Sequence, residues 1–409
     1  MTTLADAVLP LIRTRADVWR WNVANAHGTR MHEAVAILRQ AVEDDDPAEV
    51  FAVTQRAIAS ALKVIMRADD SSGIIGDACR DLLEVHPIAA ARARPEASKL
   101  VDWMVKFQFD NDCDYFTIDP VAYAPALGAE GMASYRVKLD EHAATLGPRP
   151  PEDERWSSPH SGAWFTLDWN ARRLAVFDRD VDAIIRTHAQ DRRVAAWLQD
   201  TAAALMEIGE VDAAIDWAKQ ATDFDDGHQA RRAADYWCEL LAKHRPDELL
   251  SARVQVFRRW PSSTTAGYLY RGAGAAWPDY QDEVIGRLTA RPSDAVLFAQ
   301  HSLNDVPYAW NLAHSLGLDD DRVWSDLAKA YEKLDPIAVL PVHTRLVERE
   351  LADADARRYR GAARRLKKMR KLAAGSSESA QVDEFIGDLR ERYRRRPRLQ
   401  LEFDRAGLP

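Results

Sequence analysis

The chain has few cysteines. Its 409 residues contain only three, Cys79, Cys113 and Cys238, and these are far apart in the sequence. An odd number of widely spaced cysteines provides neither a disulfide framework nor a cluster of zinc ligands. We therefore expect reduced, buried thiols in a cytoplasmic protein.

Long apolar runs are also missing. No segment approaches the roughly 18 apolar residues of a membrane span. The N-terminal segment MTTLADAVLPLIRTR lacks the basic and apolar regions of a signal peptide. The formal net charge of -9 argues against attraction of the whole surface to nucleic acid or anionic lipid, and leaves room only for a local basic patch. We expect no association with a membrane.

Sequence motifs of common enzymes are absent. The chain has no HExxH, GxSxG, Walker loop or GxGxxG, and its 11 histidines are scattered. The glycine-rich stretch GYLYRGAGAAW, residues 267–277, suits close packing of helices better than phosphate binding. We therefore predict that the protein is not an enzyme and needs no cofactor and no metal.

Two weaker patterns have a possible chemical meaning. Asp110, Asp112 and Asp114 imitate the start of a calcium loop, but Tyr115 and Val121 stand where that loop needs Gly and Glu. An acidic turn is the better interpretation of this stretch.

The second pattern is an Arg followed closely by a His, which is typical of one class of small helical-bundle ribonuclease. Arg80 and His86 fit it best. Such pairs occur four times in the chain, about as often as chance predicts, namely Arg20/His27, Arg80/His86, Arg136/His142 and Arg155/His160. The ribonuclease is therefore a remote alternative.

Helical periodicity extends over nearly the whole chain. The clearest example is the segment 324–348, which predicts two helices separated by a turn at Asp335-Pro336. Comparable units begin near residues 198, 237, 268, 296 and 359, at intervals close to the roughly 34 residues of a tetratricopeptide repeat. The residues predicted to form the core of these repeats are Ala202, Ala214, Trp237, Leu240, Trp324, Leu327, Ala328, Tyr331, Tyr359 and Ala363.

These patterns predict an all-α fold. We expect an α-α superhelix, a TPR-like solenoid of helical hairpins, preceded by an N-terminal helical domain. The predicted boundaries are 1–146 for that domain, 147–165 for a linker, 166–375 for the repeat array, and 376–409 for a capping helix and tail. Within the N-terminal domain, Thr14 is expected to cap a long helix that reaches residue 43, and another helix is expected to end before Pro87.

The residues of several helices also carry a family resemblance. GEVDAAIDWAKQA and WSDLAKAY resemble tetratricopeptide-repeat helices, over roughly residues 195–375. DSSGIIGDACRDLLEVH, YAPALGAEGMASYR and GEVDAAIDWA resemble helical regions of bacterial SWIM-type zinc-finger proteins, and of a related bacterial family of unknown function without the finger. The CxC and CxH strings of the finger do not occur here. The resemblance therefore implies a helical architecture without zinc binding and without catalytic residues.

Basic residues concentrate near the C-terminus, in RRYRGAARRLKKMRK at 357–371 and RYRRRPR at 392–398. They either dock an acidic surface or a nucleic-acid backbone, or form a solvated face that nearby acidic residues neutralise. Only Tyr359 and Tyr393 are available there for base stacking, which weakens the nucleic-acid interpretation. The candidate partner-binding residues are Arg358, Arg364, Arg365, Lys367, Lys368, Arg370, Lys371, Arg394, Arg395 and Arg396.

Stacked hairpins create an extended concave surface that mainly holds peptides and proteins. The sequence therefore predicts a scaffold or adaptor that binds another protein or peptide. The alternative is a nucleic-acid-associated protein that uses its C-terminal basic helices.

Overall fold

The regular structure of the chain is helical. The computed structural model describes residues 3–110, 115–151, 154 and 157–409, and these residues contain 21 α-helices and no strand. The all-α prediction is therefore confirmed. The chain divides into two compact units, residues 1–217 and 218–409, and the division falls within helix α10 (Val211–Asp223).

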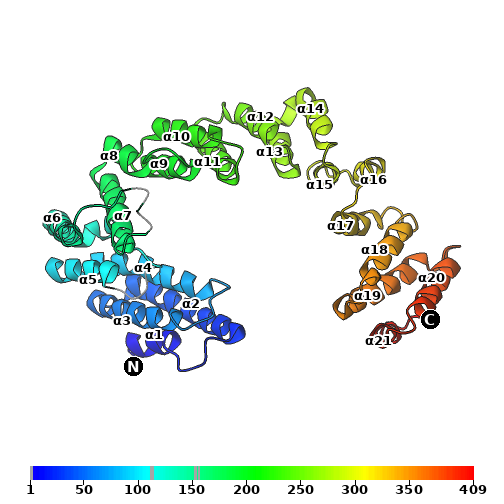
Figure 1. Cartoon of the computed structure of the whole chain (residues 1–409), viewed down its shortest axis with the longest axis horizontal. Coiled ribbons are helices and arrows are strands. Elements are labelled where there is room, and N and C mark those ends of the chain that lie inside the picture. The colour runs from blue at the N-terminus through cyan, green and yellow to red at the C-terminus, as the bar shows by residue number, and fades with distance from the viewer. Residues whose placement is uncertain (1–2, 111–114, 152–153, 155–156) are drawn as a thin grey trace. The chain divides into compact units, whose positions relative to one another are not determined.

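Nine helices precede α10 in the first unit (Figure 1). They are α1 (Leu4–Ile12), α2 (Trp21–Asp44), α3 (Pro47–Ile65), α4 (Ile74–Ala93), α5 (Ala97–Phe109), α6 (Pro120–Leu146), α7 (Ser161–Asp178), α8 (Val181–His188) and α9 (Ala195–Glu207). Helix α7 begins inside the segment 147–165 that the sequence predicts to be a linker.

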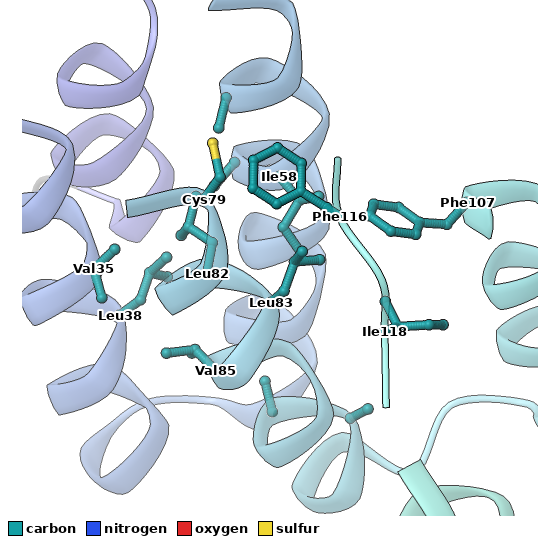
Figure 2. Close-up of a cluster of buried hydrophobic side chains, with 14 of the residues drawn as sticks. Val35, Leu38, Ile58, Cys79, Leu82, Leu83, Val85, Phe107, Phe116 and Ile118 are labelled. Carbon is teal, nitrogen blue, oxygen red and sulfur yellow. The ribbon is translucent and has the colours of Figure 1, made fainter. Parts of the chain in front are cut away.

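Helix α4 is the centre of the first unit. It packs against α2, α3 and α6, and buried residues lie on almost all of its sides, as expected of a helix enclosed by others. Its Leu82 and Leu83 belong to one buried cluster with Leu38 of α2, Ile58 of α3 and Phe116 (Figure 2).

Two details of the N-terminal domain differ from the predictions. The expected helix from Thr14 to residue 43 is wrong, because α1 ends at Ile12 and α2 begins only at Trp21. The intervening loop is held by Arg67, whose guanidinium donates hydrogen bonds to the carbonyl oxygens of Thr14 and Ala16, at 2.5 and 3.2 Å. This contact joins residues more than 50 positions apart, so the local pattern does not reveal it.

The expected end of a helix at Pro87 is also wrong. Helix α4 continues through Pro87 to Ala93 and stops where Arg94 takes the left-handed conformation, with φ of 48°. Proline removes one hydrogen bond from a helix interior, but Pro87 and its neighbours His86, Ala89 and Ala90 are buried, and this burial offsets the loss.

The second unit contains eleven α-helices that begin after residue 218, and the short 3-10 helix η2 (Gly274–Ala276). The α-helices are α11 (His228–His244), α12 (Leu249–Arg259), α13 (Ser263–Ala273), α14 (Pro278–Leu288), α15 (Pro292–His301), α16 (Val306–Ser315), α17 (Asp321–Tyr331), α18 (Leu340–Ala352), α19 (Ala356–Ala373), α20 (Ser379–Arg392) and α21 (Pro397–Ala406). The C-terminal segment 376–409 thus holds two helices where the sequence predicts a single capping helix.

Helices of the second unit pack mainly on their neighbours in the sequence (Figure 1). Helices α15 to α19 follow one another in this way, and α13 and α15 as well as α15 and α17 also touch. This is the contact pattern expected of stacked helical hairpins. The predicted repeat-core residues lie buried, except Tyr331, which is half-buried and stacks on Trp310 at 4.2 Å between ring centroids.

The helical hairpin predicted at 324–348 is confirmed. Helix α17 ends at Tyr331 and α18 begins at Leu340. The turn between them is stabilised by Asp335, whose carboxylate accepts hydrogen bonds from the backbone N–H groups of Ile337 and Ala338 at 3.0 and 2.9 Å.

The close approach of α2 and α4 yields a stability test. A β-carbon at Gly28 would lie 2.5 Å from Cγ2 of Ile74. Gly28→Ala is expected to lower the free energy of unfolding by about 1–3 kcal/mol, because overpacking outweighs the gain in helix propensity. The cost should shrink in an Ile74→Ala background, measured by urea denaturation. Gly162→Ala, which meets no atom within 4 Å, is the control. An equal cost in both backgrounds would contradict this packing.

Candidate functional site

Helix α19 carries the most distinctive charge pattern of the described residues. It contains nine Arg and Lys side chains and no acidic one. Asp355 caps its first turn, where its carboxylate accepts a hydrogen bond from the Arg357 N–H at 3.0 Å. One face of α19 packs against α18, α20 and α21. That buried face is formed by Tyr359, Ala362, Ala363, Leu366, Met369 and Ala373.

The opposite face of α19 is a single line of exposed cations. We call it the α19 basic stripe, and its members are Arg357, Arg360, Arg364, Lys367 and Lys371. Their spacing of three, four, three and four residues places them on one line of the helix. Arg357 pairs with Asp355 at 3.1 Å. The other four have no acidic partner among the described residues; the Arg364 guanidinium only donates to the backbone carbonyl of Arg360, at 3.3 Å.

The cations beside the stripe on one flank are neutralised. The Arg365 guanidinium donates two hydrogen bonds to one carboxylate oxygen of Glu350, at 3.1 and 2.7 Å. Lys368 pairs with Glu332 at 2.5 Å. Both acids lie outside α19, so these pairs connect it to α18 and to the end of α17. With side chains 19 % and 26 % exposed, the Arg365–Glu350 pair is largely shielded from solvent.

A buried histidine lies beside this pair. His343 of α18 is 2 % exposed, and its Nδ1 is 3.4 Å from Arg365 Nη1. Burial, together with the positive charges of Arg365 and Lys368, lowers the pKa of His343 to about 4. The imidazole is therefore neutral at physiological pH and adds no charge to this surface.

The remaining basic candidates on and near α19 are mostly engaged. Arg370 pairs with Asp383 of α20 at 2.6 Å, and Arg358 pairs with Asp353 at 3.4 Å. In the second cluster, Arg394 pairs with Glu391, and Arg396 donates to the carbonyl oxygen of Leu351 at 2.7 Å. Arg395 is exposed and has no acidic partner in the described part of the chain.

The interpretation as a face neutralised by nearby acidic residues is therefore correct for part of the basic region, and docking through the remaining residues stays a prediction. Of the predicted candidates, Arg358, Arg365, Lys368, Arg370 and Arg394 pair with acidic residues, and Arg396 donates to a backbone carbonyl of α18. No acidic partner in the described part of the chain is found for Arg364, Lys367, Lys371 and Arg395. Arg357 and Arg360 are not among the residues predicted from the sequence. Their spacing from Arg364, set against the buried Tyr359 and Ala363, is the signal that places them in the stripe.

The surroundings of Arg80 and His86 do not favour a ribonuclease site. His86 is 0 % exposed, and its ring lies against Trp103, with centroids 4.3 Å apart. Its Nδ1 is 2.8 Å from the Tyr123 hydroxyl, and its burial lowers its pKa to about 3. Arg80 is exposed and pairs with Asp77 at 2.6 Å. A buried, neutral imidazole has no access to a phosphodiester, so this geometry does not favour the ribonuclease.

Other candidate residues have no established chemical role. Asp112 and Asp114 of the calcium-like stretch, Cys113, and Arg155 of the last Arg/His pair lie outside the described residues. Cys79 is buried. Cys238 is half-buried, and burial raises the pKa of its thiol to about 11, so it is protonated and unreactive at neutral pH.

A small pocket of about 170 Å³ lies between α11, α12 and α13. Its polar residues include Asp235, Glu239 and Arg253, and its wall includes Tyr268. The Arg253 guanidinium crosses over Gly272 and donates to the carbonyl oxygen of Tyr268 at 3.0 Å; a β-carbon at Gly272 would be 2.5 Å from it. The charges in the pocket are mixed, so it favours neither a cation nor an anion.

The fold and this surface define an all-helical protein. In its second unit the helices pack mainly on their neighbours in the sequence, and this unit carries the exposed basic stripe. The chain belongs to a family of unknown function, DUF6880, whose model matches residues 9–398. No curated protein matches the chain. Within the described residues, we find no helix long and apolar enough to cross a membrane.

The burial of His86 predicts a dependence of stability on pH. Its folded pKa is lowered to about 3, so the unfolded chain, with a value near 6.5, binds the proton first. Its contribution to the free energy of unfolding is therefore constant above pH 6.5 and falls by up to about 1.4 kcal/mol per pH unit as the pH drops toward 3. His86→Phe should lose this slope in urea denaturation from pH 7.5 to 4. Parallel curves for the two proteins would contradict the assignment.

Proposed function

We propose that this chain is a non-enzymatic scaffold or adaptor that docks another protein through its helical-repeat surface. The observation that carries this proposal is the α19 basic stripe, in which Arg360, Arg364, Lys367 and Lys371 are exposed without acidic partners in the described part of the chain. Like charges three and four residues apart repel each other on a helix. An acidic partner would remove this repulsion.

The surroundings of the stripe support a docking role. The buried face of α19 fixes the helix on α18, α20 and α21, so the cations are presented on a packed scaffold rather than on a loose tail. Little ordering of the backbone is then needed when a partner binds, which favours affinity. The resemblance to tetratricopeptide helices supports the same role. The three cysteines are few and widely spaced in the sequence, which favours a reducing compartment, and we propose a cytoplasmic location.

A nucleic-acid-associated protein is the second candidate, because the positive charge of the same stripe attracts phosphates. Phosphates attract Arg and Lys independently of sequence, and the affinity falls steeply with salt. With four phosphate contacts, log K against log of the salt concentration should have a slope of about -3 to -4 for a duplex.

A charge-reversal experiment tests the proposal. The stripe variant is Arg360→Glu/Arg364→Glu/Lys367→Glu/Lys371→Glu. A control with the same net charge reverses four exposed cations elsewhere in the second unit, Arg231→Glu/Arg232→Glu/Lys329→Glu/Lys333→Glu. Immobilised protein should capture specific proteins from lysate of the native host, identified by mass spectrometry, and only the stripe variant should lose them, because only it loses the complementary charge.

Identical captured sets for both variants, or no captured protein at all, would contradict the scaffold. Nucleic acid carried by the wild type and lost with the stripe variant would favour the second candidate. Circular dichroism should give the same helix content for all three proteins.

A further inference from the structure

The geometry of the α19 basic stripe restricts the shape of its ligand. The stripe runs from Arg357 to Lys371. At 1.5 Å of rise per residue it is about 21 Å long, and neighbouring cations are separated by about 5 Å along the helix axis. All five lie in single file, because the spacing of three and four residues keeps them on one line. The ligand must therefore present a narrow row of negative charges.

Acidic residues border the stripe on both flanks. At about 100° per residue, Arg365 and Lys368 fall on one side of the stripe and Arg370 falls on the other. Their partners Glu350, Glu332 and Asp383 therefore line the two flanks. One carboxylate oxygen of Glu350 is buried without a hydrogen-bond partner. A broad polyanion, such as a duplex with a major groove about 12 Å wide, would place phosphates over these carboxylates.

The stripe also lacks aromatic rings for stacking bases. Tyr359, the aromatic residue of α19, is 4 % exposed and faces the core. Tyr393, at the end of α20, is covered by the Arg396 guanidinium, 4.3 Å from its ring centroid. Proteins that bind single strands combine basic grooves with stacking rings. Neither a duplex nor a single strand therefore fits this surface well.

An acidic α-helix matches the stripe in both width and repeat. Carboxylates spaced three and four residues apart on a helix recur every ~5 Å, the same repeat as the cations, so the two rows stay in register over the whole length. Side chains on one face of an extended chain recur every ~6.6 Å, and the mismatch reaches about 4 Å by the fourth contact.

We propose that the α19 basic stripe docks an acidic α-helix of a partner protein, with carboxylates at positions i, i+3, i+7, i+10 and i+14. This inference rests on the proposed function and adds the conformation and charge pattern of the ligand. The row of ion pairs is exposed at the surface, so binding is reversible and sensitive to salt.

Two synthetic helical peptides of identical composition test the inference. One carries five Glu at the positions above in an Ala/Gln background, and the other carries the same five Glu distributed around the helix. Both are first matched for helix content by circular dichroism. At about 20 mM salt, fluorescence anisotropy with the full chain should give at least about a tenfold lower Kd for the striped peptide, a difference equivalent to 1.4 kcal/mol.

Variants of the stripe make the test specific. The four-Glu stripe variant should lose the striped peptide, while the charge-matched control should keep it. The stripe variant should instead bind a peptide with Lys at the five striped positions. If the four-Glu variant is misfolded, the four-Gln variant Arg360→Gln/Arg364→Gln/Lys367→Gln/Lys371→Gln replaces it and should lose binding without gaining the Lys peptide.

The outcomes separate this inference from the proposed function. Equal affinity for the two Glu peptides would overturn the acidic helix. So would a lower Kd for either of two nucleic acids, a single-stranded RNA or a DNA duplex, with five phosphates per strand, than for the striped peptide. The scaffold would still stand if lysate proteins were captured through the stripe. No binding of any probe at low salt, together with no capture, would overturn both.

Discussion

The structure depends on the burial of apolar helix faces, which in the second unit pack mainly against helices that are neighbours in the sequence. In the second unit, small residues permit this close packing: Ala328 is 0 % and Ala363 is 2 % exposed, and both lie next to large buried residues of the same core clusters. Each buried side chain of this size contributes modestly, and the sum holds a chain of helices together. Once one face of a helix is buried in the core, the residues on its opposite face are exposed to solvent.

In helix α19, the burial of one face determines which cations lie beside acidic residues and which lie in solvent. Its core face is set by residues such as Tyr359 and Leu366, so Arg365 and Lys368 fall beside acids of neighbouring elements, and Arg364 and Lys367 fall on the solvent side. Five of its nine cations have an acidic partner, and Arg360, Arg364, Lys367 and Lys371 have none in the described part of the chain. A row of like charges on one helix lowers stability. The neutralised flanks confine this unneutralised charge to a single line, and that confinement is the basis of the proposed docking role.

The sequence predicts much of the fold and part of the surface. Regular spacing of Trp324, Leu327 and Ala328 correctly predicts a helix, and Asp335-Pro336 correctly predicts the turn after it. Local sequence patterns do not predict helix boundaries that depend on contacts with residues far away in the sequence. The loop after α1 depends on Arg67, and the passage of α4 through Pro87 depends on burial by helices that surround it. The spacing of the cations in segment 357–371 likewise predicts which of them lie on the same face of a helix. It does not predict which are neutralised, because the acidic residues that pair with Arg365 and Arg370 come from α18 and α20.

The central claim, that the cations of α19 divide into a paired set and an unpaired row, is tested most directly by the stability of two neutralised variants. The free energy of unfolding should be measured by urea denaturation for Arg360→Gln/Arg364→Gln/Lys367→Gln/Lys371→Gln and for Arg365→Gln/Lys368→Gln. The account predicts that the first variant is unchanged or more stable, by up to about 1 kcal/mol at low salt, because repulsion is removed. The second should lose about 1–3 kcal/mol, because Glu350 and Glu332 lose their partners. Destabilisation of the first variant by as much as the second would contradict the division.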